Sequence, residues 1–214
     1  RGWPVTAKAR RPRDAEATRA QILDAAESLF ASQGFGSTSL AQIATESHTH
    51  KSLILHHFVS KDGLWQAVKD RRFSGFVQEQ EEFFSGKEVS LAEVRETTRA
   101  YFNLLKGDPV LVQLLTRAEL EQDLSCSQYD ENRLAPFVER MRAAQVAGLL
   151  RKDVPPAHLL LIVINVITQW FEARAVFTGW SELGGDDPDE SFFDSLEKVY
   201  FEGALEGNSR EGNL

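Results

Sequence analysis

Three short helical patterns joined by tight turns, within residues 17–61, constrain the fold of this chain more than any other feature. From Ile22 to Phe30, apolar residues recur every three or four positions, which predicts a helix with a single packing face. Gly34 and Gly36 end this helix, because glycine is favoured just past a helix C-terminus. Three helices this close together are typical of a helix-turn-helix, whose last helix enters a DNA major groove.

The second helix is predicted from about Leu40 to Ser47 and the third from about Lys51 to Phe58. The segment Ser39-Leu40-Ala41-Gln42 forms a capping box, in which the serine accepts from the third amide and the glutamine reaches back. Ser60 can cap a fourth helix that begins at Lys61. His48 suits the joint between the second and third helices, since His is enriched in the left-handed backbone region.

Two segments of this region, TRAQILDAAESLFASQGFGSTSLAQIA (18–44) and HHFVSKDGLWQAV (56–68), resemble the N-terminal signature of the TetR (tetracycline-repressor) family. The segment between them departs from the family pattern. It has Ser47-His48-Thr49-His50 at the turn where the family usually has Ala-Gly-Val-Ser, and Leu55 where the family usually has tyrosine. A tyrosine hydroxyl can bond a phosphate and leucine cannot, so the operator preference is expected to differ.

The resemblance implies that the third helix and its surroundings contact DNA. Lys51 and Ser52 can bond base edges or phosphates, Leu55 can touch a thymine methyl, and Thr38, Ser39 and Lys61 suit phosphates. The DNA-binding residues that it implies are Thr38, Ser39, His50, Lys51, Ser52, Leu55, His56, His57 and Lys61.

Charge is distributed unevenly along the chain. Residues 1–61 hold eight Lys and Arg against five Asp and Glu, a formal charge of +3. The whole chain carries −8, so −11 falls on the remainder. A basic head on an acidic body directs the head toward phosphate and gives salt-dependent binding.

Composition fits a soluble protein of 214 residues, with 42% hydrophobic and 26% charged residues. The single cysteine, Cys126, forms no intrachain disulfide, and the cytoplasm is its expected compartment. No secretory signal peptide is recognised near the N-terminus. The longest apolar run, from Leu159 to Ile167, is interrupted at Asn165 and is shorter than the roughly 18 residues of a membrane span, so it predicts a buried helix.

Beyond Lys61 the chain shows only helical periodicity, interrupted by capping residues, glycine and proline. The expected fold is all-α, with about nine helices arranged as an N-terminal three-helix head and a helical ligand-binding and dimerisation body. The later helices are predicted at about 61–84, 91–106, 109–123, 129–150, 157–177 and 188–203. The predicted domains are a flexible basic arm (1–14), the helix-turn-helix (15–61), the body (62–205) and a disordered tail (206–214).

Metal and enzyme functions are less well supported. His48, His50, His56 and His57 cluster in sequence, but their spacing does not converge on a tetrahedral zinc site. The acidic segment 186–190 resembles a metal-binding motif of helical diphosphate-processing enzymes, but no second motif faces it, and its position complements a helix dipole. We expect no metal, no cofactor and no enzymatic activity.

The resemblance also implies that the body encloses a small-molecule effector. Asn165 and Gln169 lie one turn apart on an apolar helix, so they face either this ligand or a dimer partner. In the family, the two C-terminal helices pair with those of a second copy. The candidate ligand-binding residues are Tyr101, Phe102, Leu105, Leu114, Phe137, Met141, Asn165, Gln169, Trp170 and Arg174.

These expectations together describe a ligand-responsive transcriptional regulator, a repressor that binds a palindromic DNA operator as a homodimer and is released by an effector. The alternative is a helical small-molecule-binding protein that has lost specific operator recognition, because the turn and Leu55 depart from the family.

Overall fold

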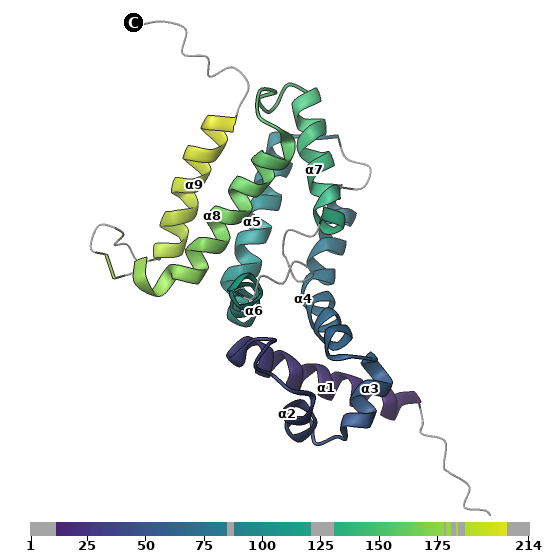
Figure 1. Cartoon of the computed structure of the whole chain (residues 1–214). Coiled ribbons are helices and arrows are strands. Elements are labelled where there is room, and N and C mark those ends of the chain that lie inside the picture. Colours follow the sequence, from purple (N-terminus) through teal and green to yellow (C-terminus); the bar gives the residue numbers. More distant parts are fainter. Residues whose placement is uncertain are drawn as a thin grey trace, which may run out of the picture.

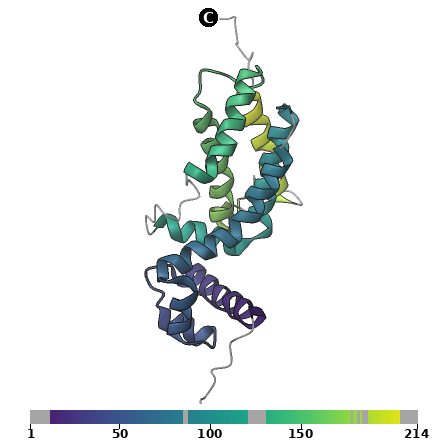
Figure 2. The same ribbon diagram turned by 90° about the vertical axis from the view of Figure 1, so that its right-hand side faces the viewer.

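The computed structural model describes residues 12–84, 88–120, 131–177, 179–180, 183 and 187–204. Predictions for the arm up to residue 11, for Cys126 and its loop, for Gly184 to Asp186 and for the tail lie outside the described residues. Within them the chain is all-α, as predicted, with nine helices of at least seven residues (Figures 1 and 2). They are α1 (Pro12–Gln33), α2 (Leu40–Glu46), α3 (Lys51–Phe58), α4 (Lys61–Phe84), α5 (Leu91–Gly107), α6 (Pro109–Leu120), α7 (Glu131–Val146), α8 (Pro156–Phe177) and α9 (Pro188–Ala204).

Helices α1 to α3 form a small head at one end of an elongated molecule, and α4 runs from the head into the body (Figure 1). The predicted apolar face of α1, including Ile22 and Phe30, is buried in the head core. Trp65 of α4 joins this core, with its ring 4.9 Å from that of Phe30. The head is therefore fixed to the first turns of α4 by aromatic packing.

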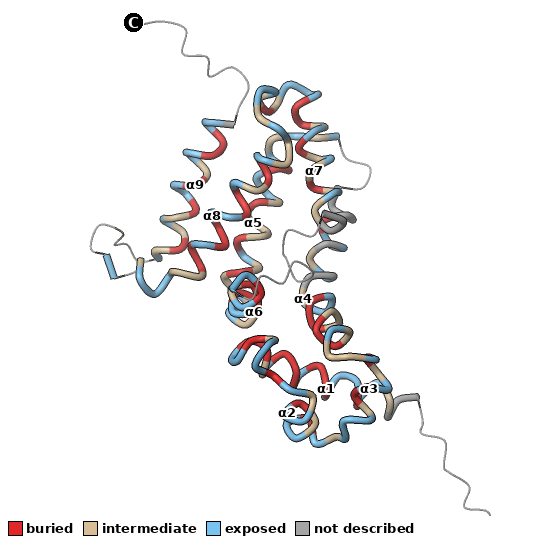
Figure 3. The backbone as a smooth tube through the Cα atoms, in the orientation of Figure 1, coloured by how far each residue is buried: buried red, intermediate tan, exposed pale blue. Residues whose placement is uncertain are grey.

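The body packs α5 to α9 around a second apolar core, visible as the inward-facing buried segments in Figure 3. Phe102 of α5 lies at its centre, with ring centroids 5.1 Å from Phe171 of α8 and 4.8 Å from Phe193 of α9. These three aromatic residues bring α5, α8 and α9 together. The amphipathic pattern of each helix thus buries its apolar face, as helix packing requires.

One predicted helix boundary is wrong. The helix predicted to reach Leu150 ends at Val146. Gly148 has a φ of 73°, and the amides of Leu149 and Leu150 turn back to the carbonyl of Ala144 at 2.9 and 3.4 Å. Glycine in a left-handed conformation ends helices in this way, so Gly148 was the stop signal that the apolar periodicity masked.

By length and composition alone, α8 is the one described helix that is apolar enough to cross a membrane. Core helices of soluble proteins pass the same test. Leu159, Val163 and Ile167 are buried against the body core, whereas Ile162 and Val166 are exposed. An outward apolar strip of this kind suits a protein interface better than a bilayer, because its neighbours Asn165 and Gln169 are polar.

Candidate DNA-binding helix and ligand groove

Helix α2 begins with the predicted capping box. Ser39 Oγ accepts from the amide of Gln42 at 3.2 Å, and Gln42 Oε1 accepts from the amide of Ser39 at 2.8 Å. Both bonds satisfy amides that the helix itself leaves without partners. The short helix is therefore held at its start by two local residues.

The turn between α2 and α3 follows the predicted backbone. His48 has a φ of 50°, in the left-handed region. Ser47 is buried, and its hydroxyl is 2.6 Å from the carbonyl oxygen of Ile43 and 2.8 Å from the Thr49 hydroxyl. The unusual sequence of this turn thus still gives a tight helix-turn-helix joint.

Helix α3 has one packed side and one open side. Ile54 and Phe58 are buried in the head core. Lys51, Ser52, Leu55 and His56 are exposed, as is His50 just before the helix, whereas His57 is half-buried. The open side therefore presents cationic, hydroxyl, imidazole and apolar groups, the chemical set that reads base edges and phosphates.

The joint between α3 and α4 is unusually tight, and the sequence did not indicate its geometry. Val59 has a φ of 66° and a ψ of −46°, and the amide of Ser60 donates to the carbonyl oxygen of Phe58 at 2.7 Å. This is a γ-turn of the rare, strained kind. Ser60 then caps α4, as predicted, by accepting from the amide of Gly63 at 2.9 Å.

Two residues implied as DNA contacts also have internal roles. Thr38 is 1% exposed, and its hydroxyl donates to the carbonyl oxygen of Gly34 at 2.7 Å. Lys61 Nζ donates to the carbonyl oxygens of Phe35 and Thr38 at 2.7 and 2.9 Å, and lies 4.1 Å from the centroid of the Phe35 ring. Two of its three N–H donors thus tie α4 to the loop before α2, which leaves one for a phosphate.

Head and body are joined by a cluster of charges as well as by packing. Glu27 of α1 is buried and accepts from Arg71 at 2.6 Å and from Arg72, both on α4. Arg72 also lies 2.5 Å from Asp108, whose second oxygen caps α6 by accepting from the amide of Leu111 at 3.0 Å. Arg72 therefore links the head helix α1 to the start of α6 in the body.

The structure separates the predicted ligand-binding residues into four groups. Phe102, Phe137, Met141 and Trp170 belong to the body core, with Tyr101 packed against it, whereas Leu114 belongs to the head core. Asn165 and Gln169 are exposed on α8. Leu105 and Arg174 line a described groove.

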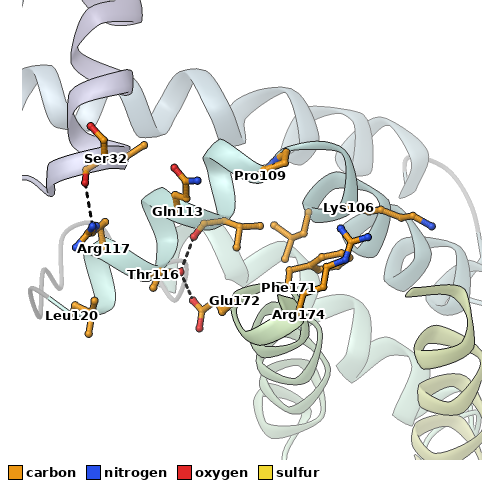
Figure 4. Close-up of a pocket in the computed structure, with 13 residues that line it drawn as sticks. Ser32, Lys106, Pro109, Gln113, Thr116, Arg117, Leu120, Phe171, Glu172 and Arg174 are labelled. Atoms are coloured by element: carbon orange, nitrogen blue, oxygen red, sulfur yellow. Dashed lines mark hydrogen bonds between the residues drawn. The ribbon is translucent and has the colours of Figure 1, made fainter. Parts of the chain in front are cut away.

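This groove lies where the end of α1 meets α5, α6 and α8 (Figure 4). Its volume is about 780 Å³, within the range of small-molecule sites. Leu105, Val112 and Phe171 give it apolar walls, and Thr116 and Glu172, which are hydrogen-bonded to one another at 3.1 Å, add a polar part to its lining (Figure 4). Glu172 at this site was not predicted, because only the fold brings α8 beside α6.

The two C-terminal helices expose apolar side chains that the single chain leaves uncovered. Ile162, Val166 and Val176 on α8 and Val199 on α9 are exposed. Asn165 and Gln169 share the open side of α8, so their position supports a dimer partner rather than a ligand as the group that they face.

The acidic residues at the start of α9 are engaged in ion pairs with the body. Lys106 Nζ lies 2.9 Å from Asp187 and 2.8 Å from Glu190, so α5 holds this end of α9. Asp189 is fully buried, accepts from Trp170 Nε1 at 2.9 Å and lies 2.7 Å from Arg174. A structural role thus accounts for these carboxylates.

Comparison with known proteins agrees with this architecture. Residues 22–68 match the family model described as bacterial regulatory proteins, tetR family. Residues 93–190 match the model of the tetracyclin repressor-like C-terminal domain. Together the two models cover most of the head and most of the body.

Curated proteins that are similar to this chain include transcriptional repressors. The HTH-type transcriptional repressor NicS of Pseudomonas putida is 26% identical over 165 residues, which cover 73% of this chain and 76% of that protein. The repressor SCO4008 of Streptomyces coelicolor is 22% identical over 198 residues, 87% of this chain and 95% of that protein.

The fold is shared with a TetR family regulator from Marinobacter aquaeolei, with a TM-score of 0.69 and 18% identity over 92% of this chain and all of that one. A second such regulator, from Haemophilus influenzae, has a TM-score of 0.66 and 20% identity over 91% and 99% of the two chains. With its helix-turn-helix head and helical body, the chain belongs to the TetR family of DNA-binding transcriptional regulators, a family that is not enzymatic.

Proposed function

We propose that this regulator is a cytoplasmic repressor that binds a palindromic operator as a homodimer and leaves it when a small-molecule effector binds the body. The observation that carries the proposal is the open side of α3, where Lys51, Ser52 and Leu55 are exposed. On the opposite side, Ile54 and Phe58 pack the helix against the head core. A rigid helix that presents such groups suits readout in the major groove.

Each DNA contact has a proposed role. Lys51 and Ser52 bond base edges or phosphates, and Leu55 contacts a thymine methyl. Ser39 and the remaining N–H donor of Lys61 bond phosphates. The implied contacts His50, His56 and His57 flank these groups, and Thr38 contributes by fixing the loop before α2.

Homodimerisation is proposed through α8 and α9. Their exposed Ile162, Val166, Val176 and Val199 are apolar side chains that a second copy would cover. A two-fold dimer places its two recognition helices about one duplex turn apart, ~34–36 Å or a multiple, and therefore calls for a near-palindromic operator.

The test is selection of bound sequences from a random duplex pool at moderate salt. We expect a palindromic consensus, and we expect Lys51→Ala to weaken binding to it by about 1–3 kcal/mol if the lysine reads a base. Lys152→Ala, an exposed lysine on the body, is the matched control and should leave operator affinity unchanged.

The alternative function makes the opposite prediction. A helical small-molecule-binding protein that has lost operator recognition would enrich no sequence while remaining a folded dimer. The departure of the turn residues and of Leu55 from the family pattern favours this alternative, whereas the intact capping box and the regular turn at His48 favour operator binding.

A further inference from the structure

Glu172 is the half-buried charged residue of the groove that has no described partner of opposite charge. Among the described residues, no Lys, Arg or His pairs with its carboxylate. Its partner is the Thr116 hydroxyl at 3.1 Å, whose single hydrogen is shared with the carbonyl oxygen of Val112 at 2.9 Å. Burial raises the pKa of Glu172, the hydrogen bond from Thr116 opposes this rise, and nearby Glu119 adds to it. A cation that entered the groove would stabilise this carboxylate.

The cations that line the same groove are less available to a ligand. Lys106 is held by Asp187 and Glu190, and Arg174 by Asp189. Arg117 is exposed at one end of the groove, where solvent screens its charge. A negatively charged ligand would have to compete with these carboxylates for Lys106 and Arg174 and would find only the solvent-screened Arg117 without one, whereas a positively charged ligand finds Glu172 without a competing cation.

The walls of the groove determine the remainder of the ligand. Phe171, Val112 and Leu105 are buried residues that border it, and Leu120 is 71% exposed at its edge. These side chains offer apolar surface next to a single carboxylate. The matching ligand therefore has an apolar body of small-molecule size with one cationic end.

We propose that the groove between α1, α6 and α8 is the effector site, and that it binds a hydrophobic ammonium compound whose cation pairs with Glu172. This inference rests on the proposed function, in which a small molecule controls DNA binding. It goes further by giving the site, the chemical class of the ligand and the residue that selects it.

The position of the groove explains how such a ligand would act on the head. Arg117 Nη2 of α6 donates to the carbonyl oxygen of Ser32, in the last turn of α1, at 3.1 Å, and both residues line the groove (Figure 4). A ligand held by Glu172 lies beside this contact between head and body. Its binding would favour one arrangement of the two parts over the other, which is the requirement for allosteric control.

Direct binding of small probe compounds to the whole chain tests the chemical class of the ligand. Calorimetry would compare 4-phenylbutylammonium, 4-phenylbutanol and 4-phenylbutanoate, which share one apolar body and differ in charge. We expect the ammonium compound to bind at least about tenfold more tightly than the alcohol, because hydrogen bonds to charged groups are the stronger ones. Equal binding of all three, or preference for the carboxylate, would overturn the proposal.

Variants test whether Glu172 selects the ammonium ligand. Glu172→Gln keeps the size of the side chain and should remove the preference for ammonium over alcohol, whereas Glu119→Gln removes a nearby exposed charge that does not line the groove and should retain it. Circular dichroism establishes that both variants are folded. Glu172→Asp, which keeps the charge, should restore part of the preference. An unchanged preference in folded Glu172→Gln would refute the role of Glu172.

DNA binding separates failure of this inference from failure of the proposed function. Operator selection is carried out without any amine, so a palindromic consensus supports the repressor function whatever the groove binds. Saturating ammonium probe should then weaken operator affinity at least about tenfold, within the usual range of allosteric coupling. Binding through Glu172 with unchanged operator affinity would show that the groove is not the effector site.

Discussion

Val59 lies in the tight joint that connects the recognition helix α3 to α4. It is 83% exposed, so no packing compensates its positive φ. The γ-turn conformation of this kind is sparsely populated and costs on the order of 1–3 kcal/mol, and a β-branched residue with positive φ is an outlier. The strain sits next to α3, where a fixed helix orientation is needed for DNA binding.

We therefore expect Val59→Gly to stabilise the protein by about 0.5–1 kcal/mol, after allowance for the extra chain entropy that glycine loses on folding. Urea unfolding would measure the change. Val146→Gly, an equally exposed valine at the end of α7 without positive φ, is the control and should destabilise. Equal losses in both variants would mean that Val59 is not strained.

For single residues, the sequence predicted contacts between near neighbours in the chain but not contacts between residues that are far apart in it. The bonds of Ser39 with Gln42 and the backbone of His48 depend on residues within a few positions, and both were predicted correctly. Lys61 binds carbonyl groups that precede it by 23 and 26 positions. Such a contact depends on the folded arrangement of α1 and α4, so periodicity and capping rules cannot indicate it.

The positions of the helices depend on the joints between them, and the joint between α3 and α4 is a tight one. A Cβ placed on Gly63 would lie 2.2 Å from the carbonyl oxygen of Phe58. Glycine is therefore required there so that α4 can start so close to the end of α3. Gly75 lies on the same helix with nothing within 4 Å of its Cβ position.

Because of this difference, Gly63→Ala and Gly75→Ala should have opposite effects. We expect Gly63→Ala to destabilise by about 1–3 kcal/mol, as overpacking does, since backbone rather than a flexible side chain must move. Gly75→Ala should stabilise by up to about 1 kcal/mol through helix propensity. Thermal unfolding measures both, and loss of operator affinity in Gly63→Ala alone would follow from a shifted α3. A stable, active Gly63→Ala protein would argue against a tight joint.

Helix positions were the most predictable part of the elements. The bounds of α3 and α4 agree with the prediction, because caps and apolar periodicity indicate the same residues there. The end of α7 was missed, since Gly148 follows a long apolar pattern that continues to Leu150. A glycine inside a periodic apolar pattern can either end the helix or lie within it, and tertiary packing decides which.

Across the whole molecule, the head is attached to the body through the fourth helix, as predicted, but the side-chain contacts of this attachment were not predicted. Residues that are distant in sequence meet there, such as Ser32 with Arg117 and Thr116 with Glu172. The sequence indicated the basic head and the acidic body as separate units. It did not indicate the groove between them, because helix periodicity says which face is buried but not which helix covers it.

The cluster of Glu27 with Arg71 and Arg72 should make this attachment sensitive to acid. Burial by itself would raise the pKa of Glu27, but hydrogen bonds from Arg72 and Arg71 outweigh it, so the folded-state pKa lies below the ordinary value of 4.5. A carboxyl with a depressed pKa stabilises the fold at pH values above its unfolded pKa. This stabilisation is lost as the pH falls from about 4.5 through the lower folded-state value.

We expect Glu27→Gln to cost about 1–3 kcal/mol near neutral pH, because Arg71 and Arg72 lose their charged hydrogen bonds to Glu27 but keep Asp24 and Asp108 as partners. The variant should also lose the part of the acid dependence that Glu27 contributes. A double-mutant cycle with Arg72→Met, followed by urea unfolding at pH 7 and pH 3, isolates the pair. The coupling energy should be larger at pH 7 than at pH 3, whereas a coupling that is equal at both values would mean that packing, not charge, couples the two residues.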